Sequence, residues 1–422
     1  MDSKPIALVG GTMIDGTGRD PVNNSVLITD GKCISKVGTT ETVKIPEGCE
    51  VIDIRGKTVM PGLIDMHVHL GFDEVDMGSL YMPSHIYKPL PWYGIISYVN
   101  ARKNFEMGFT TLRDCGEVIG EYSTLALRDV INAGILRGPR LFVSGPWLTT
   151  TCGHNGSTLP LWISRNDIIS QWCVDGPDEC LKATRERIKM GVDFIKVFGT
   201  GGIMNSYNQQ EFNEEELKAI VDEAHSKGLP VSGHLEYPDG MIACLNAGFD
   251  TMEHGWVLTE EVIRLMIEKG TVLMPTISVV WNIVNRGDEL RLPKAYIETT
   301  KNTIYDKAMK SFKMAYEAGV TIATGSDCGF FTCAHGTNAQ ELEMMVKCCG
   351  MTEMEAIVAS TKTGAETLGM GSRFGTLEAE KLADVIVVDG NPLADITVLQ
   401  KKENILMVMK EGFIDVKRGA YE

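Results

Sequence analysis

The sequence lacks the features that mark membrane, secreted and nucleic-acid-binding proteins. Its 422 residues contain no apolar run approaching the ~20 residues of a transmembrane helix. The first residues show no basic segment followed by an apolar one, so we expect a cytoplasmic protein. Basic residues are in deficit, with 40 Lys and Arg against 56 Asp and Glu. This balance argues against nucleic acid and anionic membranes as partners, because both require clustered cations.

Cysteine and glycine patterns also exclude some functions. The 11 cysteines are scattered and contain no CxxC pair, so we expect reduced thiols rather than a disulfide framework. Cys328 and Cys333 lie near His335, but without a second pair they do not predict a zinc site. The glycine-rich residues 199–202 are not followed by GKS or GKT, which argues against a phosphate-binding loop.

Short apolar runs with a period of two occupy both ends of the chain. Residues 6–9 and 25–28 are examples near the N-terminus, and residues 405–410 are one near the C-terminus. Neither end has enough strands to be stable alone. We therefore predict one small β-sandwich domain formed jointly by residues 1–60 and 371–422.

The middle of the chain, residues 61–370, alternates compact apolar runs with segments of helical period. The runs resemble buried parallel strands and cover residues 63–69, 110–113, 141–144, 194–198, 230–234, 251–254, 272–275 and 320–325. Asn213 and Glu216 begin one of the helical segments with a pattern like a capping box. Eight strand and helix units in about 310 residues predict an α/β fold of the (β/α)8 TIM-like barrel type. Chemistry in such barrels lies at the C-terminal ends of the strands.

Four of the eight histidines and one aspartate fall at these predicted strand ends. His67 and His69 end the first strand, and residues two apart in a strand face the same side. His234 and His254 end the fifth and sixth strands, and Asp327 follows the eighth. Imidazole and carboxylate are common ligands of zinc. A single histidine is more often a packing residue, but this coincidence predicts a metal site inside the barrel.

The motifs around these residues resemble the amidohydrolase superfamily over nearly the whole chain. The sequence VMPGLIDMHVH at residues 59–69 is similar to that family's entry into the barrel. Four further motifs resemble a subgroup of this family, the prolidase-like, imidazolonepropionase-related dipeptidases. They are GVDFIK, MEHG, GSDCG and ADVIVV, which begin at residues 191, 252, 325 and 383. In that subgroup the lysine of the fourth strand, here Lys196, is carboxylated and bridges two divalent metals.

The resemblance implies a ligand set, residue by residue, with Zn²⁺ as the expected metal. The buried metal would be held by His67, His69 and Asp327, the exposed metal by His234 and His254, and both by Lys196. An unmodified lysine, with a pKa of ~10.4, is a cation that two metals would repel. Carboxylation converts it into an anion with two oxygens.

The implied reaction is hydrolysis of an amide bond. Under this resemblance, a hydroxide bridging the two metals would attack the carbonyl carbon. Asp327 accepts its proton and passes it to the leaving nitrogen. His154 and Tyr237 resemble residues with which related dipeptidases contact the scissile carbonyl and the substrate. We predict a dipeptide or an N-acyl amino acid with a free carboxylate as the substrate, and a homo-oligomeric enzyme.

Other interpretations stay open. A hydrolase of a phenylurea or of a mycotoxin amide is compatible with every residue named. A mononuclear deaminase or cyclic amide hydrolase of the same superfamily commonly carries His-x-x-Glu at the fifth strand. Here Tyr237 occupies the position of that glutamate, while Glu236 is one residue early and faces away if the strand continues that far. A scaffolding relative without activity would usually have lost ligands, whereas all six are present.

The substrate pocket is predicted less sharply than the metal site. Loops at residues 278–292 and 330–335 are expected to line it, and Arg286 and Arg291 are candidates for binding a substrate carboxylate. No residue among them dictates one substrate.

Overall fold

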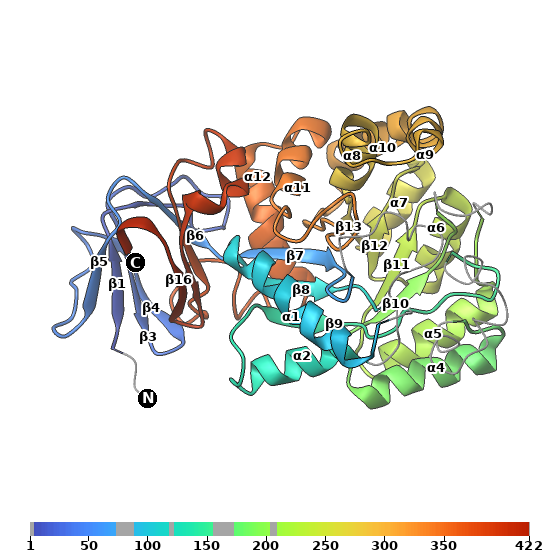
Figure 1. The fold of residues 1–422 in the computed structure, drawn as a ribbon, viewed down its shortest axis with the longest axis horizontal. Helices are drawn as coiled ribbons and strands as arrows, with labels where there is room; N and C mark the ends of the chain where they lie inside the picture. The colour runs from blue at the N-terminus through green and yellow to red at the C-terminus, as the bar shows by residue number, and fades with distance from the viewer. Residues whose placement is uncertain (1–3, 73–87, 118–121, 155–172, 203–208, 422) are drawn as a thin grey trace.

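The computed structural model describes residues 4–72, 88–117, 122–154, 173–202 and 209–421. Sheets that contain both ends of the chain lie on one side of the molecule, and the helices and parallel strands of the middle region form the rest (Figure 1). This strand and helix alternation is an α/β fold, as the sequence predicts.

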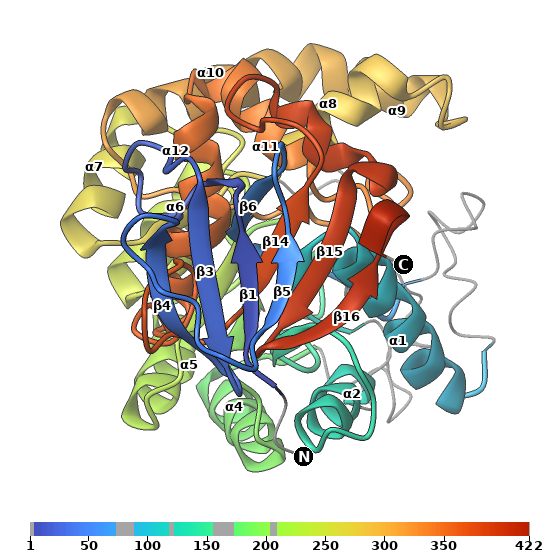
Figure 2. The ribbon, with the colours of Figure 1, turned by 90° about the vertical axis from the view of Figure 1, so that its left-hand side faces the viewer.

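Two sheets are built from the ends of the chain. The first has the order β4-β3-β1-β5 and consists of β1 (Ile6–Val9), β3 (Ser25–Asp30), β4 (Cys33–Thr39) and β5 (Glu50–Asp53). The second has the order β16-β15-β14-β6-β2 and consists of β2 (Thr12–Met13), β6 (Thr58–Pro61), β14 (Val385–Val388), β15 (Ile405–Lys410) and β16 (Phe413–Lys417). Strands from the two ends, blue and red in Figure 2, therefore lie side by side.

Strand β14 lies between two hydrophobic clusters. Val385 and Val387 pack into the cluster of the terminal sheets, whereas Ile386 and Val388 pack into the large cluster of the middle region. Successive side chains of a strand point to opposite faces, so the continuous VIVV run serves both cores. It pairs antiparallel with β15 on one side and with β6 on the other, where Ile386 lies opposite Met60.

Parallel strands form two sheets in the middle region. One has the order β7-β8-β9, with β7 (Leu63–Val68), β8 (Phe109–Asp114) and β9 (Arg140–Val143). The other has the order β10-β11-β12-β13, with β10 (Ile195–Phe198), β11 (Val231–Leu235), β12 (Thr251–His254) and β13 (Val272–Met274). Isolated parallel bridges pair Leu148 with Val197 and Leu273 with Ile322.

Helices connect and cover these strands. They are α1 (Pro91–Glu106), α2 (Ser123–Asn132), α4 (Pro177–Met190), α5 (Glu214–Ser226), α6 (Pro238–Ala247), α7 (Glu260–Lys269), α8 (Ile277–Arg286), α9 (Lys294–Thr300), α10 (Asp306–Glu317), α11 (Gln340–Met344), α12 (Glu353–Val358) and α13 (Gly364–Thr367). The predicted capping box begins α5, because Asn213 accepts from the backbone N–H of Glu216 and the Glu216 carboxylate accepts from that of Asn213. Across the described part of the chain, no helix combines the length and apolarity needed to cross a membrane.

The segment at residues 320–325 differs from the regular strand that its sequence predicts. Leu273 exchanges backbone hydrogen bonds with Thr321 and Ala323, at 2.9 and 3.0 Å. Thr324 then accepts from the N–H of Met66 at 2.8 Å. The segment thus makes isolated backbone hydrogen bonds to β13 and to β7 instead of a continuous strand ladder. It still brings Asp327 to β7, where its N–H donates to the His67 carbonyl at 2.8 Å.

Candidate metal centre

Two histidines and an aspartate converge at the end of β7. Nε2 of His67 lies 3.2 Å from Nε2 of His69 and 3.4 Å from Oδ1 of Asp327. Nε2 of His69 lies 3.3 Å from the same oxygen. All three residues are buried, and this Asp327 oxygen has no hydrogen-bond partner. Three ligand atoms facing one another in this way fit a divalent cation between them.

The opposite ring nitrogens of two histidines have partners of their own. Nδ1 of His69 lies 3.0 Å from the carbonyl oxygen of Gly116, and Nδ1 of His254 lies 2.8 Å from Oγ1 of Thr276. A carbonyl acceptor holds the proton of His69 on Nδ1. Its Nε2 then carries the lone pair that a metal requires.

Further imidazoles continue from this point toward residue 154. The ring of His254 lies 5.1 Å from that of His67 and 4.4 Å from that of His234, measured between centroids. His154 follows, 4.5 Å from His234, and stacks on Phe198 at 4.9 Å. The ligand atoms of His67, His254 and Asp327 all lie within 4.8 Å of one another. The structure thus brings the predicted histidines together.

Lys196 contributes a buried amine on the side of β10 that carries Phe198. Lys196 and Phe198 are two residues apart in this strand, and the Phe198 ring contacts those of His154 and His234. The Lys196 side chain is buried and its Nζ has no hydrogen-bond partner. An unpaired buried ammonium is unfavourable. The amine is therefore a buried polar group whose hydrogen-bonding capacity is unused.

Burial and charge set the protonation of these groups. Burial, assisted by the Lys196 charge, lowers the pKa of His67 to about 4. Burial and the neighbouring histidines hold the pKa of His234 well below its usual range. Burial alone would raise the pKa of Asp327, but the surrounding histidines lower it to about 2. Neutral imidazole and ionised carboxylate are the forms that bind a metal.

The backbone is unusual at two of these residues. His254 has a φ of 76° and Asp327 a φ of 58°. Residues other than glycine rarely adopt positive φ, and those that do concentrate at functional sites. Thr276, which contacts His254, also has a positive φ, of 48°. The positive φ angles change the direction of the side chains of His254 and Asp327, which lie beside His67.

Glu236 and Tyr237 directly follow β11. The strand ends at Leu235, so its alternation does not extend to Glu236. The condition under which Glu236 was expected to face away is therefore not met, and its Oε1 lies 3.1 Å from Nε2 of His234. Tyr237 precedes α6 and packs against the apolar core, and burial raises its pKa to about 12. Its contact with a substrate stays a prediction.

The cysteines near His335 have packing contacts. Sγ of Cys328 donates to the carbonyl of Ala334 at 3.3 Å, and Nε2 of His335 lies 3.2 Å from the carbonyl oxygen of His69. Among the described residues, neither Cys328 nor Cys333 belongs to a cluster of side chains that could hold a metal ion. His335 instead supports the backbone of a predicted ligand.

Two further features contribute no predicted metal ligand. Residues 277–286 form α8 rather than a loop, and Arg286 at its end pairs with Glu289 at 2.8 Å.

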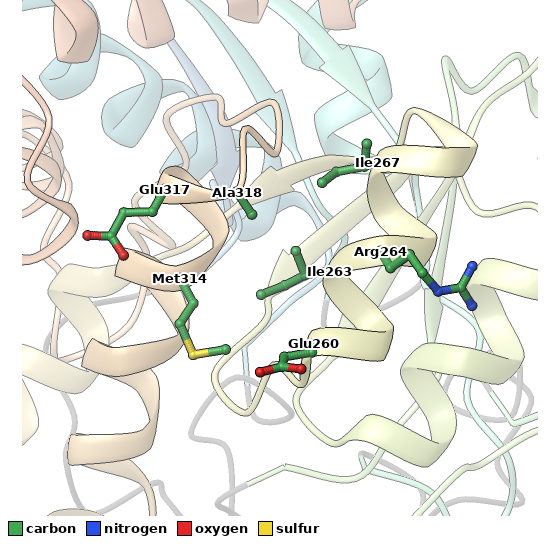
Figure 3. A pocket seen from close by; sticks show the side chains of 7 residues that line it. All are labelled: Glu260, Ile263, Arg264, Ile267, Met314, Glu317 and Ala318. Carbon is green, nitrogen blue, oxygen red and sulfur yellow. The ribbon is translucent and has the colours of Figure 1, made fainter.

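A groove of about 500 Å³ lies between α7 and α10 (Figure 3). Its walls are Glu260, Ile263, Arg264, Ile267, Met314, Glu317 and Ala318. None of these residues belongs to the predicted site.

Sequence reasoning missed Arg113 and Glu253. Both are buried charged residues inside otherwise apolar or uncharged runs, and the Arg113 guanidinium contacts the Glu253 carboxylate at 2.5 Å. Charged residues are rarely buried unless they are paired, so their placement within predicted strands was the available signal.

The buried histidines and the carboxylate that gather at the ends of these parallel strands form a possible metal site in an α/β fold. The chain belongs to the amidohydrolase family, whose sequence model matches residues 58–414. This membership confirms the resemblance seen in the motifs.

Relatives with known structures or names cover nearly the whole chain. Ochratoxinase of Aspergillus niger is 31% identical over 430 residues, which are 97% of this chain and 86% of that protein. The structure of a Xaa-Pro dipeptidase with bound methionine in its active site superposes with a TM-score of 0.86 at 33% identity, covering 97% of this chain and 99% of that chain. A prolidase complexed with N-methylphosphonate-L-proline has a TM-score of 0.85 at 28% identity, covering 98% and 100%.

Proposed function

We propose that the protein is a binuclear, zinc-dependent amidohydrolase that cleaves a dipeptide or an N-acyl amino acid with a free carboxylate. The observation that carries this proposal is the convergence of His67, His69 and Asp327 on one point, with Lys196 buried nearby without a hydrogen bond. A dipeptidase and a prolidase among its structural relatives support an amino-acid leaving group.

The residues divide into two sets of ligands. One ion would be held by His67, His69 and Asp327, the second by His234 and His254, and both by carboxylated Lys196. Two ions bound here would lower the pKa of a water molecule and polarise the scissile carbonyl.

The side chains around the ions would move protons and stabilise charge. Asp327 is ionised and would accept a proton from the attacking water and return it to the leaving nitrogen. His154 would donate a hydrogen bond to the carbonyl oxygen as negative charge develops there. Burial lowers its pKa to about 4, so the ring is neutral and keeps one N–H for this purpose. Tyr237 would contact the substrate beyond β11.

We also propose that residues 61–370 close into a (β/α)8 barrel and that residues 1–60 and 371–422 form one β-sandwich domain. The single bridges at Leu148–Val197 and Leu273–Ile322 support closure, as does the Arg113 side chain on β8, which reaches Glu253 on β12. We further propose that the protein is cytoplasmic and forms a homo-oligomer.

A substrate screen tests the proposed reaction. The metal-free protein would be reloaded with zinc, cobalt or manganese and incubated with N-acetyl amino acids and Xaa-Xaa dipeptides, and released amino acids would be quantified by mass spectrometry. We expect hydrolysis in at least one class, lost on chelation and restored by metal. Hydrolysis of neither class would contradict the substrate proposal, and an ochratoxin-type or phenylurea amide would then be tested.

A deaminase or cyclic amide hydrolase of the same superfamily is the second candidate. The contact of Glu236 with His234 favours it, because a carboxylate beside this histidine could carry protons to a ring. Lys196 favours the binuclear enzyme, since a single metal needs no bridging ligand. Ammonia release from cyclic bases, lost in Glu236→Gln, would support the second candidate over the first.

A further inference from the structure

A buried carboxylate on β12 has one oxygen fully occupied by donors. Oε1 of Glu253 accepts from Nη2 of Arg113 at 2.5 Å, from Oγ of Ser232 at 2.7 Å and from Oγ1 of Thr251 at 3.1 Å. Glu253 is fully buried. These donors fix the carboxylate in position and in its ionised form.

The second oxygen of the same carboxylate faces a predicted metal ligand. Oε2 of Glu253 lies 2.8 Å from Nδ1 of His67. The two atoms meet off the axis of an ideal hydrogen bond, but both are buried and neither has another hydrogen-bond partner. A proton on Nδ1 of His67 would therefore give Oε2 of Glu253 its donor, and Oε2 would give that N–H its acceptor.

Arg113 anchors both sides of this contact. Its Nε donates to the carbonyl of Met66 at 2.6 Å, directly before His67 in β7. Its Nη2 binds Glu253, and its guanidinium lies over the Phe194 ring at 4.9 Å. One planar cation thus holds the backbone that carries the histidine and the carboxylate that faces it.

We infer that Glu253, held by Arg113, is the positioning residue that sets the tautomer and ring orientation of His67. With the proton kept on Nδ1, the lone pair of Nε2 points to Oδ1 of Asp327 and Nε2 of His69. Carboxylates that accept from the far nitrogen of a ligating histidine act in this way in metal sites. This inference rests on the proposed metal-dependent function.

A metal ion bound between His67 and Glu253 is the alternative to a hydrogen bond between them. His67, Cys115 and Glu253 have ligand atoms within 4.8 Å of one another. However, Sγ of Cys115 is directed to the backbone, where it donates to the carbonyl oxygen of Met66 at 3.6 Å. Arg113 already neutralises the carboxylate. A proton on His67, and no third metal, fits this place.

Glu253→Gln tests the inference because an amide offers only one acceptor oxygen. If that oxygen stays with Arg113, the amide NH₂ faces Nδ1 of His67 and favours the tautomer with its proton on Nε2. The metal-free protein would be titrated with Co²⁺ against a chelator, and the cobalt absorption spectrum recorded. We expect about 10- to 100-fold weaker binding at one of two sites, with an altered spectrum.

Matched variants separate positioning from general damage. Glu216→Gln removes another buried carboxylate, which is not a predicted ligand and accepts from the backbone N–H groups of Gly176 at 2.7 Å and of Asn213 at 2.8 Å. We expect it to leave cobalt affinity unchanged. Glu253→Asp keeps the charge but withdraws it by one methylene, and we expect intermediate affinity. This variant carries the test if E253Q does not fold.

The outcomes distinguish this inference from the proposed function. Wild-type protein that binds two equivalents, with E253Q binding equally tightly and giving the same spectrum, would overturn the role of Glu253 and leave the metal-dependent function standing. Wild-type protein that binds no metal would overturn both. Three equivalents, with the third lost in Cys115→Ala, would replace positioning by direct ligation.

Discussion

Nε2 of His69 lies 3.3 Å from Oδ1 of Asp327, which joins the end of β7 to the segment that follows Ile322. The backbone of Asp327 is held independently, since its N–H donates to the His67 carbonyl at 2.8 Å. The preceding Ser326 is bound through its own N–H to Asp65 at 3.1 Å. The carboxylate can therefore be altered while its surroundings stay in place.

Asp327→Asn should abolish most turnover without unfolding the protein. The amide keeps the size of the side chain but cannot accept and return a proton, and loss of such a group costs about 10²- to 10⁴-fold in rate. The measurement is kcat/KM on the substrate found in the screen, with circular dichroism and a melting curve as controls for folding. Full activity in this variant would contradict the proposed role.

Lys196→Ala should lower the bound metal from two equivalents to one or fewer and remove activity. The bridging anion is lost, and adding acetate should restore part of the activity because a small carboxylate can enter the vacated space. Elemental analysis measures the metal, and native mass spectrometry of the wild type should show the added mass of carbon dioxide. Lys189→Ala, at an exposed position on α4, is the control. An active, fully metallated wild type with an unmodified Lys196 would refute the bridging role.

His154→Phe should reduce kcat more than it changes KM. Removing one donor to a developing oxyanion costs about 10²- to 10³-fold in kcat. The loop should stay in place, because the backbone N–H of His154 donates to Glu211 at 2.5 Å. Steady-state kinetics measure the effect, and Cys152→Ser, at an exposed position in the same loop, is the control. An unchanged kcat would show that this histidine only packs against Phe198.

Glu411→Gln should destabilise the metal-free protein more at pH 7 than at pH 3. Glu411 joins the hairpin of β15 and β16 to Arg140 at 3.1 Å and to Lys32 at 2.8 Å. Burial alone would raise its pKa, but Lys32 and Arg140 lower it to about 2. A carboxyl that is more acidic when folded adds stability that is complete above its unfolded pKa of ~4.3 and is lost as the pH falls toward its folded pKa.

Denaturant unfolding at the two pH values measures the Glu411 contribution. Glu47→Gln, at an exposed carboxylate, is the control. A difference between wild type and E411Q that is equal at pH 7 and pH 3 would show that charge on Glu411 does not hold the hairpin.

Local patterns predicted most of the elements and the gathering of ligand-type residues. Period-two spacing placed His67 and His69 on one face, and strand order brought His234 and His254 beside them. These inferences need only neighbouring residues and the rule that parallel strands end at one edge.

The remaining features depend on contacts that sequence spacing does not contain. Glu236 reaches His234 because β11 ends at Leu235, and strand ends are set by tertiary packing. Glu253 is held by Arg113 from β8, a strand that is not its neighbour in the sheet. The segment around Ile322 keeps the hydrogen bonds of a strand but divides them between two neighbours, which an apolar run alone does not reveal.

The pairing of β6 with β14 has a consequence for how the chain is made. Strand β6 leads directly into the strand that carries His67 and His69, yet its partner Val385–Val388 emerges from the ribosome more than 300 residues later. Such a non-local contact carries a large loop-closure cost and forms late. During synthesis the edge of β6 is exposed and prone to mispairing. The site-bearing strand is therefore expected to become rigid only once β14 has been synthesised, which favours metal uptake after that point rather than before it.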